Sequence, residues 1–151
     1  MALLSNGVNM KHVPSILLVE DNEQDEILTI KALKKNKVLN DIKVARDGEE
    51  ALDMLFNQRN DLHHVPQLIL LDLKLPKIDG LEVLRRIRDN MRTKIIPVVI
   101  LTTSKEDCDL LSGYELGANS YVRKPVDFFE FSEVVRQLGT YWLLLNEKAP
   151  I

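Results

Sequence analysis

The sequence predicts a doubly wound α/β domain with a five-stranded parallel sheet, and three observations support this. Residues 16–19, 68–71 and 98–101 are apolar throughout, which is typical of strands buried on both faces of a sheet. Segments with apolar residues at helical spacing alternate with the strands in five strand-then-helix units. Right-handed crossovers then place helices on both faces of the sheet.

The first unit is an expected strand at 15–19 followed by a helix at 23–36. The helix has acids in its first turn and lysines in its last turn, an arrangement that the helix dipole favours. The second unit is a short strand at 42–45 and a helix at 49–57, whose apolar residues recur at helical spacing. A turn at 47–48 joins the two.

The third unit follows a polar stretch at 58–64, which we expect to be a loop. Its strand covers 67–71, and Asp79-Gly80 marks the start of its helix. Apolar and basic residues fall on opposite faces of this helix, with Leu81, Leu84 and Ile87 on one face and Arg85, Arg86 and Arg88 on the other.

The last two units complete the sheet. Pro97 opens a strand at 98–101, and the helix at 106–116 is stopped by Gly117. A short strand at 120–122 leads to a last helix from about residue 127, which keeps helical spacing of apolar residues as far as residue 145.

The length of 151 residues and the hydrophobic content of 45% suit one domain. We expect this domain to span 15–146, with flexible tails at 1–14 and 147–151. No apolar run reaches the ~18 residues needed to cross a bilayer, and the first tail lacks the apolar core of a signal peptide. We therefore expect a cytoplasmic protein without a membrane partner.

The net charge, the single cysteine and the histidine spacing argue against further classes of protein. A formal net charge of -3 argues against a nucleic-acid partner. The lone Cys108 cannot form an internal disulfide, which suits a reducing compartment, and a structural role is its simplest interpretation. His63 and His64 have no third ligand at useful spacing, so we expect no zinc site.

Polar side chains follow the predicted strands and form the candidate site. Glu20 and Asp21 follow the first strand, Asp72 the third, Thr102 the fourth and Lys124 the fifth. Each has an ordinary alternative role, because acids cap helices, threonines pack and lysines are solvated. The carboxyl ends of parallel strands share one edge of the sheet, so these groups are expected to converge there.

Together these groups suit phosphoryl transfer. Asp72 offers a carboxylate nucleophile, and the acids suit Mg²⁺, which takes one or two carboxylates with phosphate oxygens. Lys124 supplies a compact positive charge for the phosphoryl group, and Thr102 a hydroxyl donor. The reaction needs positioning and charge neutralisation above all, and this set provides both.

The order and spacing of five motifs closely resemble the receiver domain of bacterial two-component response regulators, over about residues 16–138. The motifs are Val19-Glu20-Asp21-Asn22, Leu71-Asp72 with Leu75-Pro76 and Asp79-Gly80, Leu101-Thr102-Thr103, Gly117-Ala118, and Tyr121-Val122-Arg123-Lys124-Pro125. The resemblance implies the flavodoxin-like (βα)5 receiver fold. It also implies that Asp72 accepts a phosphoryl group from a histidine kinase.

The same resemblance implies a magnesium site formed by Glu20, Asp21, Asp72 and the backbone carbonyl of Lys74. Position 20 is Glu where Asp is the commoner choice in the family, and the extra methylene favours a metal contact through water. Lys74 places a cation near the site, with an expected effect on how fast the acyl phosphate hydrolyses.

Phosphate binding is implied for Lys124, Thr102 and Thr103, and Thr102 with Tyr121 is implied to form a switch pair. A phosphate on Asp72 is expected to draw the Thr102 hydroxyl inward and let the Tyr121 ring follow. Without the resemblance, Tyr121 is more simply a fixed strand aromatic. The Lys124–Pro125 bond is a candidate for the cis form.

The end of the last helix suggests an interface. The run Tyr141-Trp142-Leu143-Leu144-Leu145 surrounds the helix and cannot face one sheet, and a large exposed apolar patch usually marks an interface. We favour a homodimer that uses Phe129, Tyr141, Trp142 and Leu145 over a tail folded back on its own domain.

The C-terminal stretch also resembles the stand-alone regulators of cyanobacterial and bacterial phytochrome kinases. This implies a light-sensing, phytochrome-type histidine kinase as phosphoryl donor. We expect no output domain after Leu145, so the signal is expected to pass to an unknown downstream protein.

Other functional classes of protein fit the sequence less well. A small-molecule-binding flavodoxin-like module would cradle a phosphate where Glu20-Asp21 would repel it. An aspartate-based phosphatase would need a second Asp at position 74, which is Lys. A nucleotide hydrolase would need a Gly-rich loop that is missing, so we expect no enzyme. A receiver that is never phosphorylated is disfavoured by the presence of Asp72, Thr102 and Lys124.

Overall fold

The protein folds as one parallel sheet in the strand order β2-β1-β3-β4-β5. The computed structural model describes residues 15–36, 41–57 and 65–150. The strands are β1 (Ser15–Val19), β2 (Asp41–Ala45), β3 (Leu68–Leu71), β4 (Val98–Thr102) and β5 (Ser120–Arg123). All four pairings are parallel, so the predicted fold class is confirmed.

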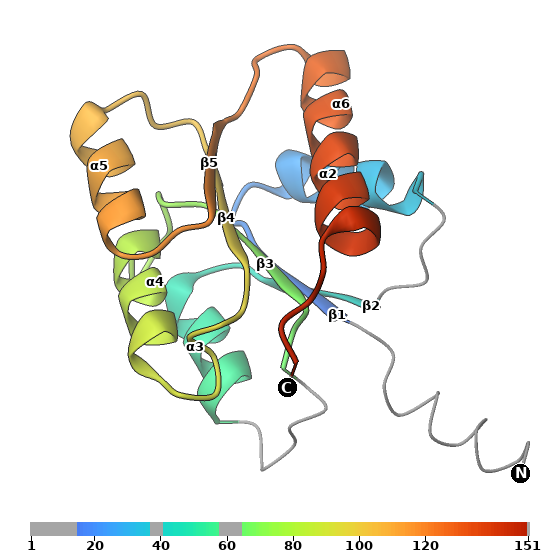
Figure 1. Cartoon of the computed structure of the whole chain (residues 1–151). Coiled ribbons are helices and arrows are strands. Elements are labelled where there is room, and N and C mark those ends of the chain that lie inside the picture. The colour runs from blue at the N-terminus through green and yellow to red at the C-terminus, as the bar shows by residue number, and fades with distance from the viewer. Residues whose placement is uncertain (1–14, 37–40, 58–64, 151) are drawn as a thin grey trace, which may run out of the picture.

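Helices cover both faces of the sheet (Figure 1). They are α2 (Glu23–Lys34), α3 (Gly48–Phe56), α4 (Gly80–Asp89), α5 (Asp107–Glu115), α6 (Phe128–Gly139) and the π-helix η2 (Thr140–Leu145). Helices α2 and α6 lie on one face, and α3, α4 and α5 lie on the other. The predicted elements within the described residues are present, with ends that differ by a few residues.

Alternate residues of each strand contribute to two separate cores. Leu17 and Val19 of β1 pack with α3 and α4, whereas Ile16 and Leu18 pack with α2 and α6. A strand needs apolar residues at every position when both faces are covered, because successive side chains point to opposite faces. This explains the unbroken apolar runs in the sequence.

Side-chain caps fix where four helices begin. Asn22, Asp47, Asp79 and Asp127 each accept a hydrogen bond from a backbone N–H in the first turn of the helix that follows, which satisfies a donor that the helix itself leaves free. Helix α5 differs, because its cap residue Glu106 makes no such bond and its one buried residue is Gly113. It therefore buries fewer residues than α2, α3, α4 or α6.

The strand order places β1 beside β3, with β2 on the far side of β1. Crossovers leave this point in opposite directions, and ligands bind at such a switch point in open α/β sheets. Gly80, at the start of α4, lies against the backbone of Asp72 and Leu73 so closely that a Cβ would overlap the Asp72 carbonyl oxygen. The start of α4 thus packs directly against the backbone that follows β3, where Asp72 lies.

Arg88 corrects one expectation about α4. The sequence places it on the face opposite the apolar residues, yet its side chain is half-buried. It donates hydrogen bonds to the carbonyl oxygens of Gly117 (2.9 Å) and Ile96 (2.8 Å) and to Asn119 Oδ1 (2.9 Å). The planar guanidinium offers several donors in fixed directions. Arg88 therefore joins α4 to the segments before β4 and β5.

The C-terminal segment continues α6 as a π-helix. Only Leu143 of this segment is buried, so the interpretation that the apolar run surrounds a helix is confirmed. The junction between α6 and η2 packs against Asn36, which follows α2. Gly139 contacts the side chain of Asn36, and Thr140 Oγ1 donates a hydrogen bond to Asn36 Oδ1 (3.2 Å).

Two further expectations have different outcomes. The Lys124–Pro125 peptide bond is trans, so the cis expectation is wrong. The tail at 1–14 and the loop at 58–64, with His63 and His64, lie outside the described residues.

None of the helices within the described part of the chain combines the length and hydropathy that crossing a bilayer requires.

Candidate functional site

The candidate site lies at the carboxyl ends of β1, β3, β4 and β5. Backbone hydrogen bonds continue the ladders past the strands: Glu20 N–H donates to Ala45 O (2.9 Å), Asp72 N–H to Val19 O (3.1 Å) and Lys124 N–H to Thr102 O (2.8 Å). The residues that follow the strands are therefore as firmly placed as the strands themselves. The expectation that these residues converge is met by Glu20, Asp21, Asp72 and Lys124.

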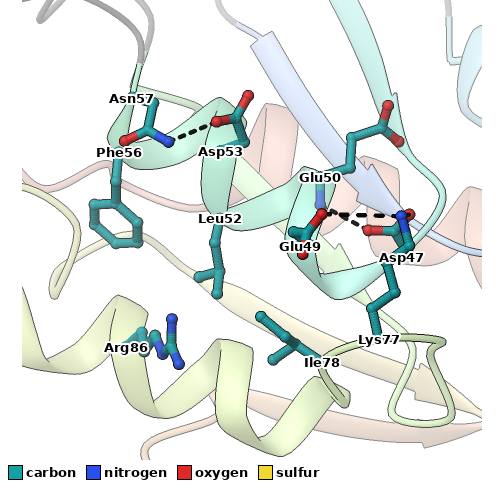
Figure 2. Close-up of a pocket in the computed structure, with 10 residues that line it drawn as sticks. All are labelled: Asp47, Glu49, Glu50, Leu52, Asp53, Phe56, Asn57, Lys77, Ile78 and Arg86. Carbon is teal, nitrogen blue, oxygen red and sulfur yellow. Dashed lines mark hydrogen bonds and ion pairs between the residues drawn. The ribbon is translucent and has the colours of Figure 1, made fainter.

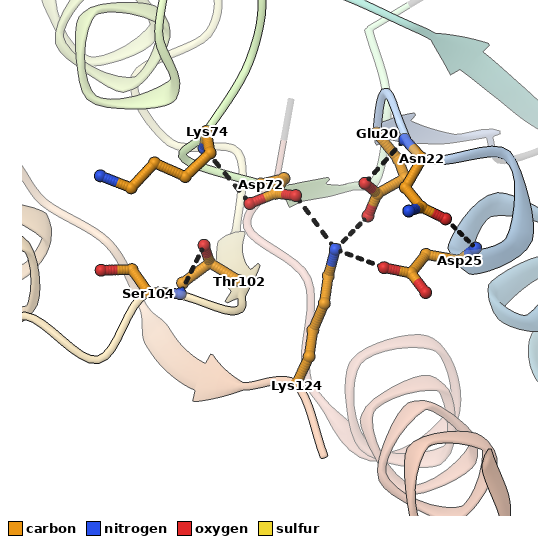
Figure 3. A network of polar contacts seen from close by, with 8 residues as sticks. All are labelled: Glu20, Asn22, Asp25, Asp72, Lys74, Thr102, Ser104 and Lys124. Carbon is orange, nitrogen blue, oxygen red and sulfur yellow. Dashed lines mark hydrogen bonds and ion pairs between the residues drawn. The ribbon is translucent and has the colours of Figure 1, made fainter. Parts of the chain in front are cut away.

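Lys124 is the centre of this site (Figure 3). Its Nζ donates to Glu20 Oε1 (2.6 Å), Asp25 Oδ2 (2.9 Å) and Asp72 Oδ2 (3.0 Å), and its side chain is 3% exposed. Burial by itself lowers the pKa of a lysine, but Asp72 and Glu20 outweigh it and hold the pKa of Lys124 above its usual range. Lys124 therefore carries a positive charge at neutral pH.

Three acids form a compact group next to this ammonium. Glu20, Asp21 and Asp72 can each offer an oxygen within 4.8 Å of the others, with Glu20 and Asp72 buried and Asp21 exposed. Carboxylate oxygens are the ligands that hard divalent cations such as Mg²⁺ prefer. The donor set thus fits a divalent cation, with one side of the group open to water.

Burial raises the pKa of Glu20 to about 7, although Lys124 partly opposes the effect. Burial outweighs the ammonium because Glu20 is 2% exposed and Lys124 is shared with two other acids. A carboxyl group that is costly to ionise gains from a bound cation. The raised pKa is therefore consistent with the fit to a divalent ion.

The pH dependence of stability provides a test of the Glu20 environment. Between pH 4.5 and about 7 the folded protein holds a proton that the unfolded chain has lost, so the free energy of unfolding falls as pH rises through this window. We expect a loss of about 2 kcal/mol between pH 5 and 8 in EDTA. Urea unfolding followed by circular dichroism measures it, and Glu20→Gln should flatten the profile. Equal slopes in the two proteins would contradict the assignment.

Thr102 is buried at the end of β4, and its Oγ1 accepts a hydrogen bond from Ser104 N–H (3.3 Å). Ser104 Oγ in turn donates to Asp109 Oδ2 (2.6 Å) at the start of α5. Thr103 is exposed beside them. A chain of hydrogen bonds thus joins Thr102 to the first turn of α5.

Lys74 approaches the site only through its backbone. Its N–H donates to Asp72 Oδ1 (3.3 Å), whereas its side chain points away from Asp72 (Figure 3). The Nζ pairs with Asp109 Oδ2 (3.2 Å) and Glu106 Oε2 (3.8 Å). The Lys74 ammonium is therefore held at the start of α5, and its expected effect on hydrolysis of the acyl phosphate stays a prediction.

Tyr121 is half-buried on β5. Its ring lies where a Cβ on Gly113 would come within 3.2 Å of it, and the ring centroid is 6.4 Å from that of Tyr114. Its hydroxyl is buried without a hydrogen-bond partner among the described residues, and burial raises its pKa. The ring thus occupies an inward position that a glycine makes available.

A hollow of about 680 Å³ lies away from this site, between α3 and α4 (Figure 2). Acids and apolar side chains line it together, including Glu49, Asp53 and Phe56. Lys77 on its rim pairs with Asp47 Oδ2 (3.6 Å). The sequence-predicted site residues are not among its lining, so the hollow is separate from the acidic group.

A family model for the response regulator receiver domain matches residues 16–136. The chain belongs to this family. Receiver domains partner with histidine kinases in phosphorelays and bind a divalent cation at an acidic site, and the geometry above has the acids and the lysine that such a domain needs.

Two curated relatives of this receiver domain match over most of their length. The probable methanogenesis regulatory protein FilR2 of Methanothrix harundinacea is 42% identical over 131 residues, covering 87% of this chain and 84% of the relative. The response regulator Rcp1 of Synechocystis is 40% identical over 130 residues, covering 85% of this chain and 88% of the relative. The chain is thus similar to regulators of about its own length.

Comparison with solved structures of receiver domains supports the same family. The phosphorylated cyanobacterial phytochrome response regulator RcpA has a TM-score of 0.84 and 35% identity, covering 91% of this chain and 99% of that chain. The Mn²⁺-bound form of Rcp1 has a TM-score of 0.84 and 38% identity with the same coverage. This receiver domain is therefore a homologue of stand-alone phytochrome response regulators.

Sequence reasoning missed three residues of this receiver site: Asp25, Ser104 and Asp109. Asp25 and Asp109 lie on helices rather than directly after the predicted strands. The available signal was that both lie in the first turn of a helix that starts beside the site, where an acid points back towards the preceding strand end.

Proposed function

We propose that this protein is a single-domain response regulator that accepts a phosphoryl group from a histidine kinase on Asp72. The observation that carries the proposal is the ion pair between Asp72 Oδ2 and the buried ammonium of Lys124, at 3.0 Å, beside the acidic group. A carboxylate held between a fixed cation and a cation-binding group is placed to receive a negatively charged phosphoryl group.

The transfer follows from the contacts of Asp72. Oδ2 is held by Lys124, while Oδ1 has only the longer contact from Lys74 N–H (3.3 Å), so we assign Oδ1 as the nucleophile. It forms a bond to phosphorus as the phosphorus–nitrogen bond of the phosphohistidine breaks, and the electron pair of that bond returns to the imidazole. Lys124 stabilises the charge of the phosphoryl oxygens.

The metal proposed for the site is Mg²⁺, with Glu20, Asp21, Asp72 and the Lys74 carbonyl as the residues that would hold it. The oxygen donors and the 4.8 Å grouping of the three acids support this choice. When bound, the ion neutralises phosphoryl oxygens during transfer. The longer side chain of Glu20 still favours a contact through water.

We propose Thr102 and Tyr121 as the switch pair, with Thr102 and Thr103 donating hydrogen bonds to the phosphate. Thr102 Oγ1 holds Ser104 N–H at 3.3 Å, and a phosphate on Asp72 offers the Thr102 hydroxyl a stronger acceptor. Inward movement of Thr102 then pulls on Ser104 and, through it, on Asp109 of α5. The inward ring of Tyr121 is compatible with this movement, and the surface formed by α5 and β5 changes for a downstream protein.

A phytochrome-type histidine kinase is the proposed donor. The support is the similarity to Rcp1 and to RcpA, a phytochrome response regulator, over nine-tenths of the chain. The kinase would meet the edge of the sheet at which Asp72 lies.

The test is incubation of the full chain with acetyl phosphate and Mg²⁺, followed by intact mass spectrometry. We expect one added phosphoryl group, which hydroxylamine removes because an acyl phosphate is labile. EDTA should prevent the labelling. Stable labelling, labelling at several sites, or labelling that survives EDTA would overturn the proposal.

A homodimer through the C-terminal segment is also proposed. Tyr141, Leu144 and Leu145 are 49%, 55% and 68% exposed, and Trp142 packs edge-on against Tyr141 while also contacting the core. Phe129, 85% exposed, is a separate contact, because twelve residues or about 18 Å of helix separate it from Tyr141. An apolar surface of this kind is suited to a second copy.

Replacing Leu144 and Leu145 together with Glu is expected to give a monomer by light scattering, where the unmodified chain gives a dimer. These two residues are better targets than Trp142, whose core contacts would be lost as well. Met91→Glu is the control, because Met91 is 82% exposed on another part of the surface. An unchanged mass in the double variant would remove this segment from the interface.

A further inference from the structure

Lys124 contacts one acid that has no part in the proposed metal set. Asp25 Oδ2 lies 2.9 Å from Lys124 Nζ, yet Asp25 is outside the group of acids whose oxygens lie within 4.8 Å of one another. It lies on α2, whereas Glu20 and Asp72 follow strands. Asp25 therefore touches the lysine from another side (Figure 3).

The local structure fixes Asp25 in this place. Asn22 Oδ1 accepts a hydrogen bond from Asp25 N–H (2.9 Å), and Asn22 N–H donates to Glu20 Oε2 (3.2 Å). One cap residue thus binds the backbone of Asp25 and the carboxylate of Glu20, the two acids that contact the ammonium from this side of the site. The start of a helix also favours a negative side chain, and Asp25 lies in the first turn of α2.

Lys124 and a divalent cation compete for the same oxygens. The ammonium contacts Glu20 Oε1 and Asp72 Oδ2, and both carboxylates belong to the acidic group. When a doubly charged ion enters, it attracts these carboxylates more strongly and repels the ammonium. The lysine side chain is 3% exposed, so it cannot simply turn into water and needs another anionic partner.

We propose that Asp25 is this partner: a positioning residue that retains the Lys124 ammonium when a cation occupies the acidic group, and so sets the cation affinity. The inference rests on the proposed metal site. Before the cation binds, the ammonium is shared among three carboxylates; afterwards Asp25 holds it nearly alone. Loss of Asp25 therefore costs more in the cation-bound state, which lowers the affinity.

The experiment measures Mn²⁺ binding to the full chain, from the decrease of the electron paramagnetic resonance signal of free Mn²⁺. Asp25→Asn should weaken binding at least about fivefold, the lower end of typical coupling between sites. Glu23→Gln is the matched control, because it removes an exposed acid from the same first turn, and it should change binding less than twofold. Equal effects of the two substitutions would overturn the proposal.

A second variant isolates the role of Lys124. In Lys124→Met the competitor is absent, so Mn²⁺ binding should tighten and Asp25→Asn should then change it less than twofold. A full fivefold effect in this background would mean that Asp25 attracts the ion directly, which contradicts the proposal. If Lys124→Met does not fold, the Asp25 and Glu23 comparison decides. Failure of the unmodified chain to bind Mn²⁺ would instead refute the proposed metal site.

Discussion

Asp72→Asn is expected to abolish labelling by acetyl phosphate, from one phosphoryl group per chain to none detectable. The amide has nearly the shape of the carboxylate, and its oxygen can still accept the hydrogen bond from Lys124 Nζ, now 3.0 Å from Asp72 Oδ2. It lacks the negative charge that makes the carboxylate a nucleophile and a cation ligand. The chain should therefore keep its fold and lose its chemistry.

Asp79→Asn is the matched control for this experiment. It is the same substitution seven residues further along the chain, at the cap of α4, where Asp79 Oδ1 accepts from Glu82 N–H (3.1 Å). Asn caps a helix as well as Asp does, so labelling should be unchanged. Undiminished labelling of Asp72→Asn, with a circular dichroism spectrum like that of the unmodified chain, would show that another residue is the acceptor.

Lys124→Met is expected to lower the free energy of unfolding by about 3–5 kcal/mol in EDTA at pH 8, because removing one partner of a buried ion pair leaves uncompensated buried charge. Here Glu20 and Asp72 are 2% and 6% exposed, and both lose their cation. The loss should be smaller at pH 5, where Glu20 is protonated, since its pKa is already raised to about 7. Urea unfolding at both pH values measures the difference, and added Mg²⁺ should recover part of it at pH 8.

Lys74→Met is the control for Lys124→Met, because it removes a lysine that forms ion pairs but is not buried. Lys74 also pairs with two acids, Asp109 at 3.2 Å and Glu106 at 3.8 Å, but its side chain is 59% exposed. Ion pairs between solvent-exposed side chains contribute little to stability, so this variant should unfold close to the unmodified chain. Similar losses for the two lysine variants would mean that burial of Lys124 has no energetic consequence.

The fold could be predicted because local and global preferences agree along the chain. Apolar runs such as 68–71 have the composition of a strand covered on both faces, and capping residues such as Asp79 mark the start of a helix. The principal site residues could be predicted for a related reason. Parallel strands end at one edge, so Glu20, Asp72 and Lys124 converge there whatever the lengths of the intervening helices.

Other features depend on contacts that no local pattern encodes. The Asp25 carboxylate is paired with Lys124, which is distant in sequence, and the Lys74 ammonium is paired with acids at the start of α5. Arg88 has the spacing of a solvated residue, yet carbonyl groups of two other segments bind it. The π-helix begins directly after Gly139, which lies against the side chain of Asn36. Each requires the assembled domain.

The weak attachment of α5 has a mechanical consequence. This helix contributes one buried residue, Gly113, whereas α4 contributes four, so α5 can slide across the sheet without withdrawing a large side chain from the interior. Leu111 and Tyr114 on the same helix are 61% and 50% exposed. A small displacement driven from Ser104 and Asp109 would therefore reposition two bulky groups on the outer surface at little energetic expense.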